Sequence, residues 1–487
     1  MISQIEFSVQ CDENLADINL ARADVLVLFG ATGDLAKKKL FPALYEMEES
    51  GELEIPVFAV ASSKWTQDEF KNRAKVSIHE RKEALGEVVD EEVLKRLLNK
   101  MHLVVGDYQE PQTFIALREA LVGFKLPVIY LAIAPGMFTD VTQGLAKVGL
   151  TSTARVVVEK PFGRDLSSAV ELDMALKKIL PEDQIYRIDH YLGKESVEDL
   201  LVFRFANTLF EPVWNRNYIS NIQITMSEDF GIEGRGKFYD EVGALRDVVQ
   251  NHLLQVLTML TMEPPIDMGS RALQDEKVKV LSAVREILPR DVVRGQYVGY
   301  LGEAGVSAHS PTETFVAMRL FIDNWRWAGV PIYLRTGKKL AETTMEAIVE
   351  FNQPPRQLFS AKGAPVPQPN IVRFRLGRQD GVDLSLQAKA PGAALITNTV
   401  DLTVEFAAAL GQRKEAYERL LDAAILGDHF RFTRIDSVLK SWEILENVVR
   451  APSKLHPYFG ASWGPDEALG LVPGGWGVVG TAADKSD

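Results

Sequence analysis

Short apolar segments alternate with amphipathic segments along the first part of the chain. Helical periodicity occupies residues 35–49, 66–83, 91–99 and 112–122, and the apolar segments read DVLVLFG (24–30), VFAVA (57–61), MHLVVG (101–106), PVIYLAI (127–133) and ARVVVE (154–159). Continuous apolar strands that alternate with helices are typical of βαβ units, in which helices cover both faces of a parallel sheet. The pattern therefore predicts a doubly wound α/β domain.

A different pattern begins past residue 190. Long helical stretches at 193–207 and 241–262 are mixed with alternating strands at 221–229, 312–323 and 382–389. Alternation of apolar and polar positions favours an antiparallel sheet with one face on a core, so this half is predicted to be an α+β domain. We expect the proline-rich residues 353–370 to form an irregular surface loop. We expect the Gly-rich residues from Val472 onward to be loosely held.

Composition and charge narrow the class of protein. Of the 487 residues, 46% are hydrophobic and 25% are charged, which is ordinary for a folded chain with a core. The net charge of −13 and the pI of 5.2 argue against nucleic acid as a partner. No apolar run is long enough to span a membrane, so no membrane partner is expected.

Cysteine usage and the N-terminal sequence suggest a compartment. The lone cysteine, Cys11, cannot form an internal disulfide, and no cysteine cluster offers a zinc site, so no metal site is predicted. The acidic N-terminus lacks the apolar core of a signal peptide. We therefore expect a reduced, cytoplasmic enzyme.

A glycine-rich turn follows the first predicted strand. The spacing Gly30-x-x-Gly33-x-x-Ala36 is a variant of the dinucleotide fingerprint. Small residues let the backbone approach a pyrophosphate, whose charge the N–H groups at a helix N-terminus then stabilise. An ordinary strand–helix turn is the alternative, but the position in the first βαβ unit favours coenzyme binding.

The end of the second predicted strand bears on the choice of coenzyme. An NAD-selective site usually carries Asp or Glu there, which binds the ribose 2′-hydroxyl. The residues here are Ala61, Ser62, Ser63 and Lys64. Hydroxyls and an ammonium suit a 2′-phosphate, so the pattern favours NADP. The alternative is that Lys64 is a solvated surface charge.

The segment QIYRIDHYLGKES (184–196) lies at the junction of the two halves and contains Asp189, His190, Tyr191 and Lys194. If a helix begins at Tyr191, then His190 and Lys194 share one face. An imidazole, a phenol and an ammonium gathered there would bind a phosphate. A solvated helix start is the alternative.

Lys160 lies in EKPFGRDL (159–166), near the carboxyl end of the preceding strand, where open α/β sheets bind their ligands. The bond to Pro161 is a candidate for the cis form. A lysine at the junction of coenzyme and substrate and a solvent lysine at a turn are equally consistent with the sequence.

The predicted helix at 240–260 carries His252 on an apolar face, together with Leu245, Val248, Val249 and Val256. A lone histidine in such a stripe is most often a hydrogen-bonded core residue. Burial also lowers the pKa of a histidine, however, and so keeps it neutral, as a general base requires. A carboxylate would have to orient its ring, and Asp189, Glu228 and Asp247 are all candidates. Glu228 extends the buried face of its strand, which suits binding to sugar hydroxyls, or else marks a wet strand end.

Longer segments of the chain resemble glucose-6-phosphate dehydrogenases. Over residues 24–466 the following occur in the family's order: GATGDLAKKKLFPALY, EKPFGRDL, RIDHYLGKE, RFAN with WNR, GRGKFYDEVGALRDVVQNHLLQ, DEKVKVL, GQY, VPIYLRTGKKL, AYERLL and GASWGP. RIDHYLGKE and RDVVQNHLLQ are highly specific. Residues 1–22 precede any strong periodic pattern and are predicted to form an N-terminal extension. The resemblance implies a Rossmann-like dinucleotide-binding domain (23–188) and an α+β substrate and oligomerisation domain with a large mixed or antiparallel sheet (189–487).

The resemblance also implies a reaction, the first oxidative step of the pentose phosphate pathway. The C1 hydroxyl of glucose 6-phosphate would be oxidised to 6-phosphoglucono-1,5-lactone, with hydride transfer to NADP, or to NAD. His252 would be the general base and Asp189 its orienting carboxylate. His190, Tyr191 and Lys194 would hold the 6-phosphate, and the other substrate residues would be Lys160, Glu228, Asp247, Lys338 and Lys39. The coenzyme site would comprise Gly30, Ala31, Thr32, Gly33, Asp34, Leu35, Ser62, Tyr130 and Lys160. A homodimer or homotetramer is implied as well.

Three positions depart from the family's pattern. Ser62 stands where an Arg often contacts the 2′-phosphate. Thr343 and Thr344 stand where another basic residue commonly serves the substrate phosphate, and its loss is expected to weaken binding by about 1–3 kcal/mol. Arg375 stands where Gln is frequent, and we hypothesise that it supplies the missing charge.

Three other functions are weighed against this one. GASWG (460–464) matches the nucleophile elbow of hydrolases around Ser462, but Pro465 follows at once and no histidine occurs after His456. A non-catalytic sensor of NADP or sugar phosphate is a second alternative. A related EKP-type oxidoreductase that acts on an unphosphorylated sugar is the third.

Overall fold

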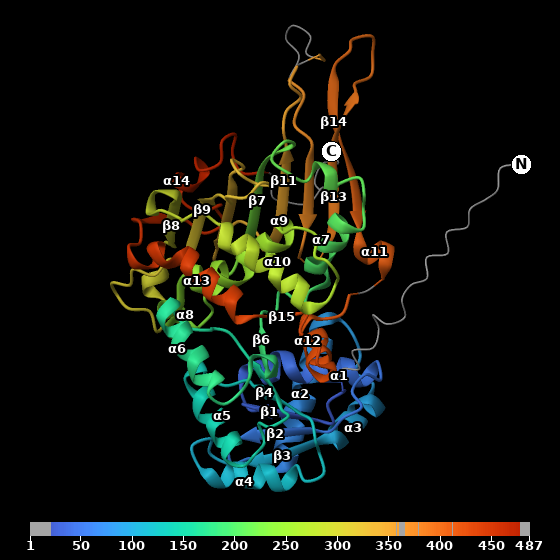
Figure 1. Ribbon diagram of the computed structural model, residues 1–487, viewed down its shortest axis with the longest axis vertical. Helices are drawn as coiled ribbons and strands as arrows, with labels where there is room; N and C mark the ends of the chain where they lie inside the picture. The colour runs from blue at the N-terminus through green and yellow to red at the C-terminus, as the bar shows by residue number, and fades with distance from the viewer. Residues whose placement is uncertain (1–20, 357, 360–365, 378, 412, 478–487) are drawn as a thin grey trace, which may run out of the picture.

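The computed structural model describes residues 21–356, 358–359, 366–377, 379–411 and 413–477. Cys11 and the predicted extension up to residue 20 lie outside this part. A parallel sheet with its helices forms one end of the molecule, and a larger mixed sheet forms the other (Figure 1). Within the described ranges, none of the helices combines the length and the apolar character needed to cross a membrane.

The first sheet has seven strands in the order β15-β6-β5-β4-β1-β2-β3, all parallel except β15. Its strands are β1 (Val25–Phe29), β2 (Val57–Ala61), β3 (Met101–Val105), β4 (Pro127–Leu131), β5 (Arg155–Val158), β6 (Ile185–Ile188) and β15 (Phe432–Thr433). Every residue of β1 and β4 is buried, because helices cover both faces. The predicted doubly wound fold is confirmed.

Two groups of helices cover this sheet. Leu26 and Leu28 of β1 face one hydrophobic cluster, and Val25, Val27 and Phe29 face the other. The first cluster lies under α1 (Phe41–Glu49), α2 (Gln67–Leu85) and α3 (Glu91–Lys100). The second lies under α4 (Pro111–Ala120), α5 (Phe138–Lys147) and α6 (Leu166–Lys177).

The second sheet has nine strands in the order β14-β13-β12-β11-β7-β10-β9-β8-β16. It is mixed, because β7 pairs with β10, and β8 with β16, in parallel. The strands are β7 (Ile219–Ser227), β8 (Val292–Tyr297), β9 (Phe315–Leu320), β10 (Ile332–Gly337), β11 (Thr344–Phe351), β12 (Ile371–Arg375), β13 (Gly381–Lys389), β14 (Thr397–Glu405) and β16 (Leu455–Tyr458). The described residues between β11 and β12 carry no helix or strand, as predicted; 357 and 360–365 lie outside the described part.

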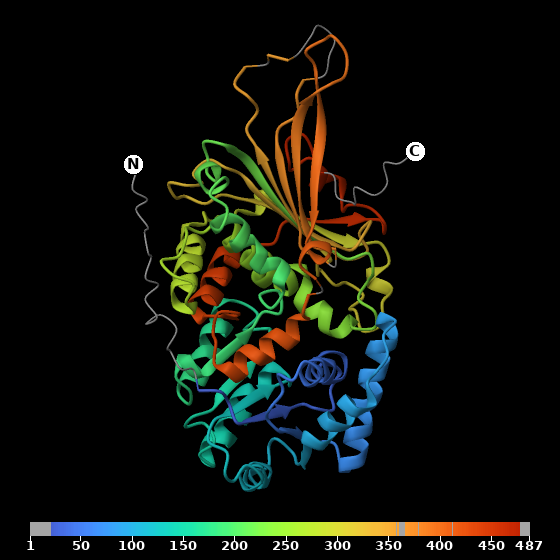
Figure 2. The same cartoon turned by 90° about the vertical axis from the view of Figure 1, so that its right-hand side faces the viewer.

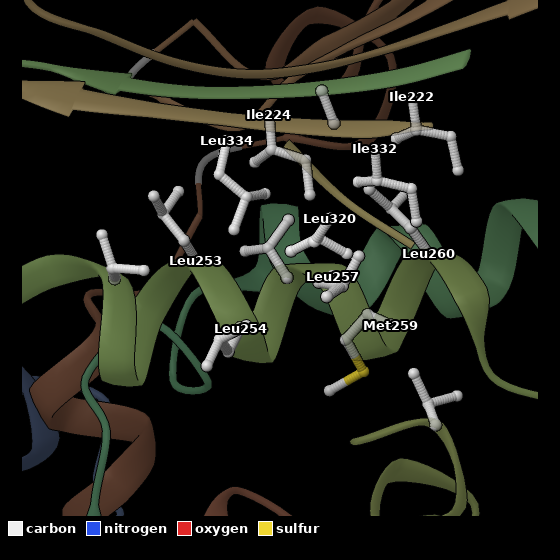
Figure 3. Close-up of a cluster of buried hydrophobic side chains, with 14 of the residues drawn as sticks. Ile222, Ile224, Leu253, Leu254, Leu257, Met259, Leu260, Leu320, Ile332 and Leu334 are labelled. Atoms are coloured by element: carbon white, nitrogen blue, oxygen red, sulfur yellow. The ribbon is translucent and has the colours of Figure 1, made fainter. Parts of the chain in front are cut away.

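One face of the second sheet packs on helices. These are α7 (Glu195–Phe205), α9 (Leu254–Thr261), α10 (Ser270–Ala283) and α13 (Ile435–Arg450). In Figure 3, Leu253, Leu257 and Leu260 lie against Ile222, Ile224, Ile332 and Leu334 of the sheet. This packing fixes the helix that carries His252.

The remaining elements are α8 (Gly236–Ala244), α11 (Phe406–Leu410), α12 (Ala416–Leu426), α14 (Asp466–Leu469), the π-helical η2 (Ala36–Leu40) and η6 (Leu245–Leu253), and short 3₁₀ turns η3 (Pro135–Met137), η4 (Glu182–Gln184), η5 (Glu211–Val213), η7 (Pro289–Asp291) and η8 (Tyr300–Gly302).

The single helix predicted at 240–260 is wrong in detail. The chain kinks at Gly243 (φ 66°, ψ 173°) and continues as the π-helical segment η6 and then α9. Glu313 Oε1 accepts the backbone N–H of Leu245 at 3.1 Å, which caps the start of η6. His252 therefore lies on a wider helical turn, and not on the regular helix from which its face was predicted.

The alternation predicted one face of the second sheet on a core, and part of its other face is buried too. The polar side of β7, with Gln223, Thr225 and Ser227, is buried as well. The guanidinium of Arg335 lies 4.7 Å from the ring centre of Trp463 and 4.3 Å from that of Trp476. Residues 472–477 thus cover the sheet and are not loosely held, whereas 478–487 lie outside the described part.

The C-terminal part of the chain returns to the first sheet. β15 pairs antiparallel with β6, and α12 joins the hydrophobic cluster of α1–α3. Arg155 of β5 donates to the carbonyl oxygens of Ala424 (3.1 Å) and Ile425 (2.5 Å) at the end of α12. The predicted boundary at residue 188 stays a prediction, and the structure adds that residues 416–433 pack on the first of the two units.

Candidate active site

One residue from the junction of the two halves and one from the second half form a hydrogen-bonded pair between the sheets. Asp189 directly follows β6, and His252 lies near the end of η6. His252 Nδ1 is 2.6 Å from Asp189 Oδ1, and both side chains are buried. Because a carboxylate only accepts hydrogen bonds, Nδ1 carries the ring proton and Nε2 presents a lone pair. Of the three carboxylates left open as partners of the ring, Asp189 is the one in contact.

Burial sets the charge states of this pair. It lowers the pKa of His252 to about 4, although the carboxylate of Asp189 opposes the shift. Burial alone would raise the pKa of Asp189, but His252 and the backbone N–H of Tyr191, 3.0 Å from Oδ1, hold that pKa well below its usual range. At neutral pH the imidazole is therefore neutral and the carboxylate ionised, which is the state that a general base requires.

Lys160 contacts the other nitrogen of the His252 ring. It precedes a cis peptide bond to Pro161. Its Nζ is 2.9 Å from His252 Nε2, 2.8 Å from the carbonyl oxygen of Asp247 and 3.2 Å from Asp247 Oδ1. Lys160 is therefore not a solvent lysine. Burial alone would raise the pKa of Asp247, but Lys160, and then Lys338, lower it to about 2.

The predicted phosphate-binding residues gather beside the His252 ring. Ring centroids of His190 and Tyr191 lie 4.6 and 4.1 Å from that of His252. Lys194 Nζ lies 4.0 Å from the centre of the Tyr191 ring. Burial lowers the pKa of Lys194 to about 8, so its ammonium remains charged at neutral pH.

The helix predicted to begin at Tyr191 begins instead at Glu195, with Lys194 as the preceding residue. Asp189 Oδ1 accepts the N–H of Tyr191, a local turn that competes with a helix. Gly193 packs against α12, since its carbonyl oxygen accepts from Arg419 at 2.7 Å. Lys39, exposed on η2, is close enough for its charge to contribute to the lowered pKa of Lys194.

Glu228 and Lys338 form an ion pair at the ends of two adjacent parallel strands. Glu228 follows β7 and Lys338 follows β10, and the N–H of Glu228 donates to Gly337 O at 3.0 Å. Glu228 therefore stands at a partly exposed strand end beside a cation. Thr343 stands at a position where the family commonly has a basic residue. It forms hydrogen bonds with Asp229, which follows Glu228 in the sequence. A neutral hydroxyl thus occupies that position.

The glycine turn has the geometry of a phosphate cradle. Gly30 has φ +78°, and a Cβ there would lie 2.1 Å from the carbonyl oxygen of Ala132. The N–H of Gly33 donates back to Gly30 O at 2.9 Å. Gly33 and Asp34 are exposed where the following helix starts. A bend that begins and ends with glycine at a helix start fits a pyrophosphate, so the residues present suit a dinucleotide.

The other predicted coenzyme residues lie around this turn. Ser63 Oγ and Thr32 Oγ1 are 3.4 Å apart, and Ser62 is exposed. Tyr130, in β4, is fully buried, and its hydroxyl is 2.5 Å from Glu159 Oε1. Contact between Tyr130 and the coenzyme therefore stays a prediction. The other two are Ala31, which is buried, and Leu35, which is partly exposed.

Three residues near the site escaped the sequence reasoning. The hydroxyl of Tyr108 accepts the N–H of Gly30 at 2.9 Å. Buried Glu159 interacts with Tyr417, whose ring stacks 6.2 Å from that of His190. Glu159 and Tyr417 lie in EKPFGRDL and AYERLL, so those segments were a signal for both. Tyr108 lies in no such motif.

Two further sequence-based hypotheses concern Arg375 and Ser462. Arg375 pairs with Asp383 and donates to the carbonyl oxygens of Gln379 (3.1 Å) and Val404 (3.3 Å), and its supply of the missing positive charge stays a prediction. Ser462 Oγ donates to Phe459 O at 2.6 Å in a local turn, and no nucleophile elbow is formed.

Comparisons with known proteins agree on one family. Residues 27–199 match the family described as "Glucose-6-phosphate dehydrogenase, NAD binding domain", and residues 201–474 match the corresponding C-terminal domain. "Glucose-6-phosphate 1-dehydrogenase 1" of Mycobacterium tuberculosis is 43% identical over 456 residues, which cover 93% of this chain and 96% of that protein.

Two solved structures are similar throughout. A crystal structure of glucose-6-phosphate 1-dehydrogenase from Mycobacterium avium superposes with a TM-score of 0.88 at 44% identity, covering 94% of this chain and 99% of the other. A glucose-6-phosphate dehydrogenase in complex with its substrate glucose-6-phosphate has a TM-score of 0.83 at 35% identity and the same coverage. The likeness thus extends across both sheets and the residues between them.

Proposed function

Because the chain belongs to the glucose-6-phosphate dehydrogenase family, we propose that it oxidises glucose 6-phosphate at the pair formed by His252 and Asp189. The resemblance, the fold class and the oxidoreductase activity predicted from the sequence are confirmed by these matches. The coenzyme is a nicotinamide dinucleotide. The roles of individual residues are our proposal, and the observation that carries them is the 2.6 Å contact between the two side chains.

His252 Nε2 takes the proton of the C1 hydroxyl. In the structure, the lone pair of Nε2 faces Lys160 Nζ at 2.9 Å. When the substrate binds, the sugar hydroxyl replaces that contact and Lys160 turns to the sugar oxygen. As the imidazolium forms, the charge of Asp189 stabilises it across the Nδ1 bond. The bound coenzyme supplies the acceptor for the hydride that leaves C1, and the product is 6-phosphoglucono-1,5-lactone.

The far end of the substrate is anchored by charge. Lys194, His190 and Tyr191 converge beside the pair, and they bind the 6-phosphate. Glu228, Asp247 and Lys338 orient the sugar, with Lys39 nearby. The anchor distinguishes this reaction from oxidation of an unphosphorylated sugar, because a buried ammonium prefers a dianion to a neutral hydroxyl.

NADP is the proposed coenzyme. No acidic residue occupies the end of β2, where exposed Ser62 and Lys64 are available to a 2′-phosphate. With NADP the reaction is the first oxidative step of the pentose phosphate pathway. A cytoplasmic location stays a prediction.

A spectrophotometric assay of coenzyme reduction tests the function. Purified protein is given glucose 6-phosphate or glucose, each with NADP or NAD, over a range of concentrations. We expect kcat/KM to be highest with glucose 6-phosphate and NADP. Equal rates with glucose would support the related EKP-type oxidoreductase, and no turnover with any pair would support a sensor. A higher kcat/KM with NAD would refute only the choice of coenzyme.

We further propose a homodimer or homotetramer that uses the second sheet. The β13–β14 hairpin projects from the molecule (Figure 2), and β14 is an edge strand. Val400, Leu402 and Val404 share one face of β14 and are exposed. Unprotected apolar edges are normally covered.

Light scattering tests the oligomeric state. It is expected to give the mass of two or four chains for the unmodified protein, and Leu402→Asp is expected to give monomers. Thr403→Asp, on the opposite face, is the matched control; a monomeric unmodified protein would refute the proposal.

A further inference from the structure

The second carboxylate oxygen of Asp189 has no visible partner. Oδ1 serves His252 and the N–H of Tyr191, whereas Oδ2 is buried without a hydrogen bond to any described residue. Leaving a buried ionised oxygen unbonded is costly. Something that the described residues do not supply must therefore bind Oδ2.

A small cavity adjoins Asp189. Its volume is about 20 Å³, and its wall includes Asp189, Gln255, Thr433 and Ser441. Each of these four contributes a buried oxygen that lacks a partner among the described residues. A polar cavity of this size holds an ordered water molecule, which needs two to four such partners. We call this space the polar chamber.

Lys277 lies in the helix that packs beside the chamber. Its side chain is 0% exposed, and its Nζ has no hydrogen-bond partner in the described part of the chain. One turn earlier on the same face of α10, Gln274 donates to Phe432 O at 2.7 Å, next to Thr433 of the chamber wall. α10 also packs on α13, which brings Ser441 to the chamber.

The electrostatics agree with this placement. Burial lowers the pKa of Lys277 to about 8, and the charge that opposes the shift is that of Asp189. Lys277 is thus mostly protonated at neutral pH. A buried ammonium and a buried carboxylate, each with a free hydrogen-bonding position, attract one another strongly where water is scarce.

We infer that Lys277 is a positioning residue for Asp189, which it holds through ordered water in the polar chamber. The ammonium donates to water, and water donates to Asp189 Oδ2. This keeps the carboxylate ionised and its Oδ1 on His252 Nδ1. The inference rests on the proposed function, because it gives Lys277 a part in the same proton transfer.

The other groups that act on the pair are few. His190, Lys160 and Asp247 face His252 from the turn after β6, from the end of β5 and from η6. α9 and α13 present the neutral side chains of Gln255, Ser437 and Ser441. Lys160 lines the polar chamber and also contacts His252 Nε2, whereas Lys277 acts on Asp189 from α10.

Lys277→Met removes this charge while keeping an unbranched side chain. Loss of the cation raises the pKa of both Asp189 and His252, so the acid limb of kcat/KM moves to higher pH by about one unit. We expect kcat to fall by about tenfold and KM for glucose 6-phosphate to stay within about twofold, since Lys277 does not touch the phosphate group. Lys277→Gln, which keeps hydrogen bonding, is expected to recover part of kcat.

The matched control is Lys82→Met. Lys82 is also buried, in α2, but its partners are Glu46, Glu49 and Glu87. Its loss is expected to lower the melting temperature and to leave the acid limb in place. An unmoved limb and an unchanged kcat in a folded Lys277→Met variant, beside an active unmodified enzyme, would overturn the inference and leave the proposed function intact.

A crystal structure of the unmodified protein decides the matter independently of activity and of variant folding. We expect ordered water about 3 Å from Asp189 Oδ2, linked to Lys277 Nζ directly or through a second water. A dry Oδ2, or a Lys277 ammonium bonded only to other groups, would overturn the inference.

Discussion

At the scale of single residues, burial and a few neighbouring charges set the protonation states that the chemistry needs. His252 is neutral because burial lowers its pKa to about 4. Asp189 is ionised because His252 and a backbone N–H outweigh its burial. Lys194 keeps its charge at neutral pH with a pKa of about 8. Each group thus has the form that its proposed role requires.

Two substitutions separate proton transfer from substrate anchoring. His252→Ala is expected to lower kcat by about 10²-fold or more, because it removes the general base, with KM nearly unchanged. Lys194→Ala is expected mainly to raise KM for glucose 6-phosphate, because it removes a phosphate contact. Steady-state kinetics with saturating coenzyme measures both. Identical defects in the two variants would contradict this division of roles.

The same residues predict the pH dependence of kcat/KM. Activity falls as pH drops through about 4, where His252 gains a proton and can no longer accept one. It also falls as pH rises through about 8, where Lys194 loses its charge. Lys194→Arg is expected to move the alkaline limb upward, because a guanidinium stays protonated. An alkaline limb that Lys194→Arg leaves in place would assign it to another group.

At the scale of elements, the strands follow from the sequence better than the site helix does. Continuous apolar runs such as 127–133 locate β4 directly, because a strand covered on both faces needs an apolar side chain at every position. The kink at Gly243 depends on Glu313, which is far along the chain. Helical periodicity therefore placed His252 on the correct stretch and missed the π-helical turn that aims it.

The residues of the site also differ in how well the sequence predicts them. Asp189, His190, Tyr191 and Lys194 are close in sequence, so their clustering was visible. The partner of His252 was not, because three carboxylates qualified and only long-range packing selects one. Lys277 lies in the family segment DEKVKVL, but that segment gave no reason to single it out, since an unpaired buried lysine is recognised only once its surroundings are known.

Gly243 is expected to be intolerant of a side chain. Its backbone lies in a region that is essentially restricted to glycine, and a Cβ would lie 2.5 Å from Glu313 Oε1. Gly243→Ala should lower the free energy of unfolding by about 1–3 kcal/mol and also lower kcat, because η6 would shift. Denaturant unfolding and kinetics measure these effects. Gly234→Ala, also at positive φ but with open space around it, should keep kcat; equal kinetic losses would contradict the explanation.

At the scale of the whole molecule, elements that follow the mixed sheet in the sequence complete the parallel sheet. Residues 416–433 pack on the parallel sheet although they follow the mixed sheet in the sequence. Residues 23–188 alone would therefore expose the edge of β6 and the apolar surface that α12 covers. We expect this fragment to aggregate or to lack cooperative unfolding by circular dichroism. Addition of residues 414–452 is expected to restore solubility; a monomeric fragment with a sharp transition would contradict this view.

The pairing of β15 with β6 can form only late in translation. A ribosome releases the strands β1–β6 long before it has translated Phe432 and Thr433, which pair with Ile188 and Arg187. During that interval the nascent chain carries an open sheet edge beside uncovered apolar side chains, which is a surface that chaperones bind. A polypeptide that terminates early, between the mixed sheet and α12, would keep that apolar surface exposed permanently. We expect the quality-control proteases of the cell to degrade it.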